Sequence, residues 1–161
     1  MTWLADALVT LWRKPSPAGL GSEWEPPASF EEIAAAWPDS LIPDDAVELW
    51  AVCRSAQLYV DTAYGQWGLV LLSPAASAAR TALERAARPE DVTADDLVIG
   101  EFLGDLDLLI LAPGERDERR VLVALPLDPR VEWYGVGSSL ADFLVAYGEA
   151  DGDKWWEAGA E

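Results

Sequence analysis

Residues 97–113 read LVIGEFLGDLDLLILAP, a mainly apolar run that Gly104-Asp105 interrupts near its centre. Apolar runs of this length, bounded by a Gly-Asp step, predict two strands joined by a turn, at 97–103 and 107–112. Asp105 and Asp107 need an explanation, because carboxylates are rarely buried without a partner. Two explanations are open: the two acids bind a metal ion, or they mark a turn and a polar strand position in a domain that only binds.

Residues two apart on a strand point to the same side, so Asp105 and Asp107 would present two carboxylates together. With Glu101 as a third ligand, such a pair would suit Mg²⁺ or Mn²⁺, which prefer oxygen ligands. Two aspartates separated by one residue are a weak signal, however, and Gly104-Asp105 already suits a turn. We therefore expect no metal, no cofactor and no catalytic residue here, and keep a divalent-metal carboxylate enzyme as an alternative.

The remaining patterns predict helices and short strands separated by turns of hairpin length. Ser29, Ser73 and Ser138 have the character of helix caps, and Gly148 suits the end of the last helix. Residues 15–27, rich in proline and glycine, predict a linker after an N-terminal helix. The expected strands are 57–61, 66–72, 97–103, 107–112, 120–127 and 131–137. This order favours an α+β fold with a mainly antiparallel central sheet of about five to six strands packed by helices.

The chain has 161 residues, of which 51% are hydrophobic, as is typical of a globular protein. We expect an N-terminal helix and linker extension over 1–27 and a single domain over 28–161. The sequence has no histidine and one cysteine, Cys53, which excludes Ser-His-Asp and Cys-His catalysis and a disulfide within the chain. The N-terminus lacks the order of a secretory signal, and no apolar run is long enough to cross a membrane, so a cytoplasmic location is expected.

Charge is the strongest global feature, with 29 acidic and 11 basic side chains and a net charge of −18. Such a chain repels nucleic acid and anionic membranes, and it attracts a basic partner. The acidic tail 149–161 also carries Trp155 and Trp156. These two tryptophans either form part of a binding surface or fold the tail back onto the core, and the sequence leaves both possibilities open.

Four segments together resemble the SUKH superfamily, the Smi/Knr-like domain. They are LIPDDAVELW (41–50), YGQWGLVLLSP (64–74), LVIGEFLGDLDLLIL (97–111) and SSLADFLVAY (138–147). The resemblance spans roughly residues 28–147 and rests on the order and spacing of the segments. It implies an α+β domain whose Gly104-Asp105 step is a turn between core strands.

Many bacterial members of that family are immunity proteins, which bind and neutralise a toxin that is often a nuclease or a nucleic-acid deaminase. The resemblance therefore implies a non-enzymatic immunity protein with a basic toxin domain as its partner. An intracellular regulatory or adaptor protein of the same fold is the alternative. The partner-binding candidates are Asp44, Asp45, Glu48, Asp105, Asp107, Trp155 and Trp156.

Overall fold

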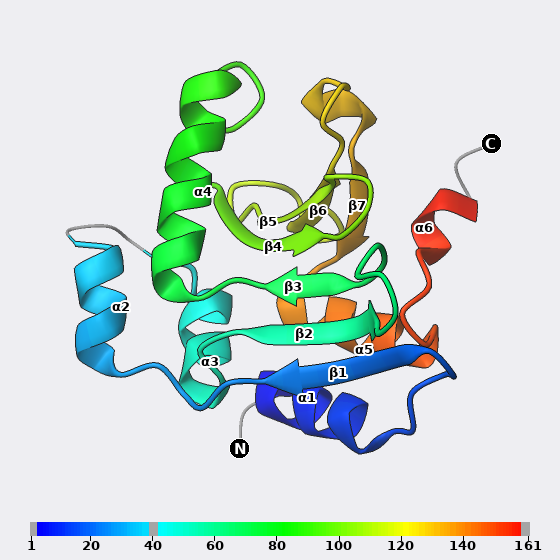
Figure 1. Cartoon of the computed structure of the whole chain (residues 1–161). Helices are drawn as coiled ribbons and strands as arrows, with labels where there is room; N and C mark the ends of the chain where they lie inside the picture. The colour runs from blue at the N-terminus through cyan, green and yellow to red at the C-terminus, as the bar shows by residue number, and fades with distance from the viewer. Residues whose placement is uncertain (1–2, 39–41, 159–161) are drawn as a thin grey trace.

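The computed structural model describes residues 3–38 and 42–158. Helices and strands are interspersed along these two ranges, with a short 3-10 helix, η1, before the last strand (Figure 1). Their bounds are α1 Trp3–Arg13, β1 Leu20–Trp24, α2 Phe30–Ala36, α3 Asp44–Val52, β2 Ala56–Asp61, β3 Leu69–Leu71, α4 Pro74–Ala87, β4 Leu97–Phe102, β5 Leu108–Leu111, β6 Val121–Ala124, η1 Arg130–Glu132, β7 Tyr134–Gly137, α5 Leu140–Glu149 and α6 Trp155–Ala158.

The strands form one seven-stranded sheet in the order β1 to β7, and every neighbouring pair is antiparallel. The predicted α+β class is confirmed, and the sheet has one strand more than the upper expectation. The added strand is β1, in the segment predicted to be a linker, so that prediction is wrong for residues 20–24. Leu20 pairs with Asp61 and Trp24 with Ala56. β1 is an edge strand with a neighbour on one side alone, and its register shifts between Gly21 and Glu23.

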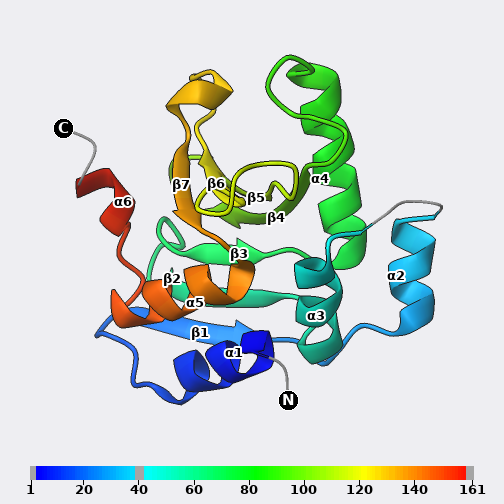
Figure 2. The same cartoon turned by 180° about the vertical axis from the view of Figure 1, so that it is seen from behind.

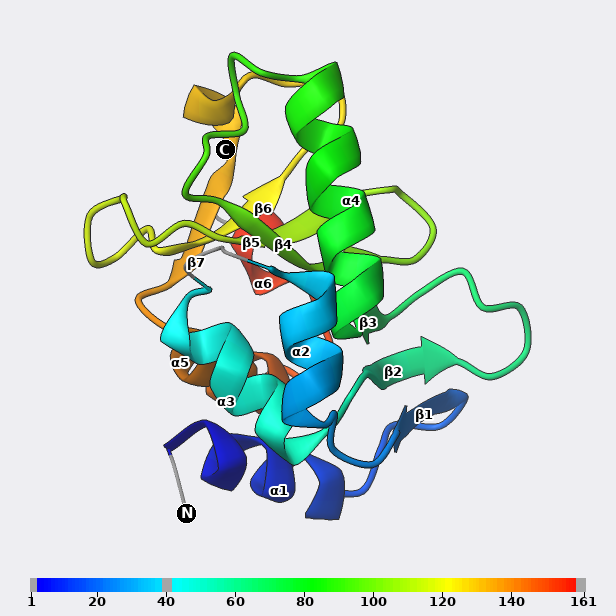
Figure 3. The ribbon, with the colours of Figure 1, turned by 90° about the vertical axis from the view of Figure 1, so that its left-hand side faces the viewer.

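Both faces of the sheet are covered by apolar packing. α1, α3 and α5 lie on one face, where Trp50, Phe143 and Tyr147 join the larger core (Figure 2). α4 lies on the other face, above a smaller core that includes Val92 and Trp133 (Figure 1). α2 packs against α4, as the side view shows (Figure 3). The larger core therefore lies between the sheet and three helices.

The two-sided covering explains the composition of residues 97–113. β4 and β5 form the predicted hairpin, and their side chains alternate between the two cores. Leu97 and Ile99 face the larger core, whereas Val98 and Ile110 face the smaller one. Because nearly all side chains of these two strands are buried, a mainly apolar run replaces the alternation that is typical of a half-exposed strand.

Helix ends follow local hydrogen bonding, with two corrections to the sequence prediction. The Ser29 and Ser73 hydroxyls accept hydrogen bonds from the Glu32 and Ala76 amides, at 3.1 and 3.2 Å, as expected of caps. Ser138 is not the cap of the last helix, because the next residue, Ser139, takes that place. Gly148 does not end that helix either.

Gly148 lies inside α5 at its contact with α1. A methyl group there would lie 3.6 Å from Leu11, which is an ordinary contact distance, so the packing of the two helices also has room for alanine. Leu4, Leu8 and Leu11 of α1 are buried in the larger core. α1 and β1 therefore share one core and one sheet with the rest of the described chain. Within the described ranges, no helix is both long and apolar enough to cross a membrane.

Candidate functional site

Two of the predicted site residues, Asp105 and Asp107, lie in the turn between β4 and β5. Gly104 has a φ of +99°, and a methyl group on it would lie 2.2 Å from the Gln66 carbonyl oxygen. Only glycine fits this conformation and this approach. One residue later, the Asp105 carboxylate accepts a hydrogen bond from the Asp107 amide at 3.2 Å. Asp105 therefore stabilises the turn, as the sequence analysis expected of a turn acid.

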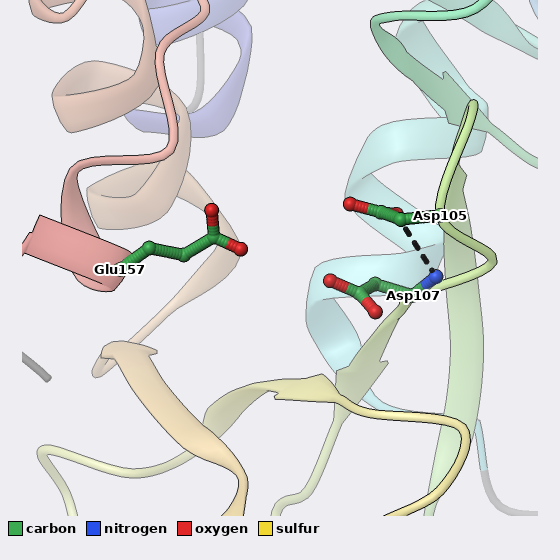
Figure 4. Close-up of side chains that lie close together, drawn as sticks. All are labelled: Asp105, Asp107 and Glu157. Carbon is green, nitrogen blue, oxygen red and sulfur yellow. Dashed lines mark hydrogen bonds between the residues drawn. The ribbon is translucent and has the colours of Figure 1, made fainter.

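The side chains of Asp105 and Asp107 meet Lys154, which precedes α6. Lys154 is only 5% exposed, and its ammonium forms an ion pair with Asp105 and lies 3.8 Å from an Asp107 oxygen. Glu157 of α6 approaches from the other side (Figure 4). One carboxylate oxygen from each of the three acids lies within 4.8 Å of the others. We call Lys154, Asp105, Asp107 and Glu157 the Lys154 cluster.

Two aromatic rings complete the surroundings of the Lys154 ammonium. Its nitrogen lies 5.3 Å from the centroid of the Trp67 ring and 5.1 Å from that of Phe102. These distances fit cation–π contacts, which are stronger when the cation is removed from water. The ammonium therefore joins α6, the β4–β5 turn and the segment before β3 at one point.

The Lys154 cluster perturbs the acidity of Asp107. Burial raises the pKa of Asp107 to about 6, and the neighbouring Asp105 carboxylate adds to the rise, while Lys154 opposes it. Burial dominates because a carboxylate removed from water loses more hydration than one neighbouring ammonium at 3.8 Å replaces. Burial therefore places the pKa of Asp107 at about 6, well above that of an ordinary aspartate.

The cluster differs from the metal site that the sequence allowed as an alternative. Glu101, the expected third ligand, instead pairs with Arg80 at 2.6 Å. Glu157 takes its place beside Asp105 and Asp107. These three carboxylates suit a divalent cation in ligand type, but the Lys154 ammonium already supplies positive charge to two of them. A metal ion would have to displace that ammonium, and the absence of a metal site stays a prediction.

The tail tryptophans pack inward. The Trp156 ring is 7% exposed, with its centroid 5.5 Å from that of Phe102 and 6.0 Å from that of Phe143. Trp155 is half-buried and lies 5.7 Å from Phe143. Of the two possibilities for the tail, the structure shows the one in which it folds back onto the core. Trp156, and Asp107 at 4% exposure, are therefore corrected from partner contacts to interior residues.

The α3 acids lie apart from the Lys154 cluster, with no contact to it within the described ranges. Asp45 has a structural role, since its carboxylate accepts a hydrogen bond from the Leu140 amide at 2.8 Å and so helps to cap α5. Asp44 is exposed and Glu48 half-buried. The side chains of Asp44 and Glu48 make no hydrogen bond or ion pair with other described residues, which leaves both available to a partner.

Sequence reasoning missed Lys154, Glu157 and Trp67. One signal was present, because Lys154 is the single basic residue of the acidic tail 149–161 and stands directly before the two tryptophans. A lone cation among carboxylates and aromatic rings has several favourable partners. Its position therefore indicated an anchoring contact.

No protein-family model matches the chain, and no curated protein matches it. The resemblance to the SUKH superfamily thus stays a hypothesis that rests on the four sequence segments.

Proposed function

We propose that this protein is a non-enzymatic, cytoplasmic immunity protein that binds and neutralises a basic toxin domain, such as a nuclease. Two arguments support the proposal. The first is the resemblance of four sequence segments to the SUKH superfamily. The second, which carries more weight, is the way in which the fold uses its basic side chains.

Nearly all the basic side chains contact other groups of the same chain. The chain has 11 lysines and arginines, all within the described ranges. All but Arg13 and Arg116 make an ion pair with a carboxylate or a hydrogen bond to a backbone carbonyl. Arg85, for example, donates to the carbonyls of Ala94 and Asp96 at 2.8 and 2.6 Å.

The acids greatly outnumber these cations, and many of them, including Asp44 and Glu48, have no such partner among the described residues. The molecule consequently carries a large excess of negative charge. A toxin that binds nucleic acid presents a cationic cleft, which is the complementary surface. Electrostatic attraction of this kind speeds association and favours the correct partner more than it adds affinity.

The test is binding to the C-terminal domain of the protein encoded beside this gene, together with growth rescue on co-expression. We expect nanomolar affinity and full rescue. We also expect the association rate constant to fall by about tenfold or more between low and physiological salt, because salt screens the attraction.

The outcomes separate the hypotheses. An association rate that does not change with salt would remove the electrostatic part of the proposal. Absence of both binding and rescue would reject the immunity function and favour the adaptor alternative. Heat released on titration with millimolar Mg²⁺ or Mn²⁺ would instead favour a metal-dependent enzyme at the Lys154 cluster.

A further inference from the structure

A groove of about 470 Å³ opens on the α4 side of the sheet. Its lining residues come from the C-terminal part of α4, from the β4–β5 turn and from the end of β6 with the chain after it, elements that can be located in Figure 1. Leu108 and Ala124, at the edge of the smaller core, line it together with Leu103 and Pro126. The apolar part of the groove is therefore formed by the partly exposed Leu103 and the exposed Pro126, above the buried Leu108 and Ala124.

Leu106 lines this groove in an unfavourable backbone conformation. Its φ is +68°, in the left-handed region that favours glycine and asparagine, and its side chain is 76% exposed. A non-glycine residue there costs about 1 kcal/mol. An exposed leucine recovers none of that cost from the core, so folding alone does not account for it.

A second exposed leucine follows the groove residue Pro126. Leu127 is 94% exposed, and the segment that carries it is held against α4. Arg88 of α4 donates to the carbonyls of Leu125 and Asp128, at 3.0 and 2.5 Å. This segment is consequently fixed, and Leu127 is presented to solvent beside the groove.

Each of these leucines has an aspartate next to it in sequence. Asp105 precedes Leu106 and keeps 42% of its side chain exposed despite its ion pair. Asp128 follows Leu127 and is exposed, with no side-chain partner among the described residues. The arginines of the groove, Arg80 and Arg88, are already bound to carboxylates or carbonyls. Three acids, Glu84, Glu101 and Asp107, line the groove against these two arginines, so the groove joins apolar residues to a small excess of negative charge.

We propose that this groove is the docking surface for the partner, and that it receives an apolar side chain flanked by lysine or arginine. The identity of the partner rests on the proposed function, whereas the location and chemistry of the surface rest on the groove itself. Apolar contact would supply affinity at the centre, and the two carboxylates would select a basic segment at the rim.

The first test uses the toxin domain and substitutions of the two leucines. Leu106→Asn suits the positive φ, so it should not lower the urea midpoint, yet it should weaken toxin binding at least tenfold. Leu127→Ser should weaken binding similarly. Trp3→Ser on α1 is the apolar control and Glu23→Gln on β1 the charge control, and both should bind as the unmodified protein does. Loss of binding in the controls but not in the leucine variants would overturn the proposal while leaving the immunity function intact.

The second test needs no toxin and so judges the surface if the proposed function fails. The probe is a blocked Lys-Leu-Leu-Lys tetrapeptide, titrated to millimolar concentration against the ¹⁵N-labelled full chain. We expect amide shifts at Leu103, Leu106 and Leu108 that Leu106→Asn abolishes, and much weaker shifts with Glu-Leu-Leu-Glu. Shifts that map elsewhere, or equal effects from both peptides, would overturn the proposal.

Discussion

Replacing Asp107 by asparagine should change how the stability of the protein depends on pH. Asparagine has nearly the same shape as aspartate and carries no charge, so it removes the titration and little else. Burial holds the pKa of Asp107 at about 6 in the folded protein. An aspartate in an unfolded chain has a pKa of about 3.9.

The sign and size of the effect follow from this difference. Between these two pKa values the folded state binds the proton more tightly than the unfolded state, so stability from Asp107 is present at low pH and is lost as pH rises through about 6. A gap of about two pH units corresponds to about 3 kcal/mol in total, of which about 2 kcal/mol falls between pH 4.5 and 7.5. Relative to the unmodified protein, the asparagine variant should therefore gain about 2 kcal/mol over that interval.

Urea unfolding at pH 4.5, 5.5, 6.5 and 7.5, followed by tryptophan fluorescence, measures the difference in free energy of unfolding. Glu132→Gln is the matched control, because Glu132 is exposed and its side chain makes no ion pair with described residues. Its difference from the unmodified protein should not vary with pH. A constant difference for Asp107→Asn would refute the role of burial. A gain for the variant on acidification instead would show that the ion pair with Lys154 outweighs desolvation.

Three further predictions concern the same region. Lys154→Met leaves Asp107 buried beside two other acids, so the free energy of unfolding at pH 7.5 should fall by about 3 kcal/mol and recover in part at pH 5 in the same urea assay. Gly104→Ala should cost about 2 kcal/mol or more in chemical denaturation because its methyl group meets the Gln66 carbonyl, whereas Gly65→Ala, at a φ of +64° with open space around it, should cost about 1 kcal/mol. Trp156→Ala should lower the free energy of unfolding by about 3 kcal/mol and expose α6 to proteolysis, and an unchanged cleavage rate would contradict the packing role.

The sequence was sufficient for the parts of the fold that depend on local patterns. The β4–β5 hairpin follows from an apolar run broken at Gly104-Asp105, and the starts of α2 and α4 follow from serine caps. β1 could not be predicted in this way. Its residues 20–24, LGSEW, show no regular alternation of apolar and polar side chains and lie between prolines, and they become a strand because β2 offers an unpaired edge. A strand that forms by pairing with a segment distant in sequence need not show the alternating apolar pattern by which strands are predicted.

In the candidate site too, contacts between residues close in sequence could be predicted, whereas contacts between distant residues could not. The turn role of Asp105 is local and was expected. The burial of Asp107 depends on Lys154, and the ion pair of that lysine with Asp105 joins residues 49 positions apart. The net charge of the tail did not indicate this contact, because one lysine changes the charge of an acidic segment only slightly. Its position beside Trp155 and Trp156 was more informative than its charge.

The basic side chains also link the anchoring of the loops to the net charge of the protein. They hold segments that lack regular structure: Arg88 holds the chain after β6, Arg130 pairs with the buried Asp96 at 2.5 Å, and Lys154 holds the tail. Since the 29 acids far outnumber the 11 cations, the net charge stays strongly negative after all these contacts are formed. The same carboxylates that hold a loop through a cation also contribute to that net charge. Replacing the carboxylate partner of one of these cations would therefore loosen a loop and reduce the attraction for a basic partner at the same time, so stability and association rate are linked in this protein.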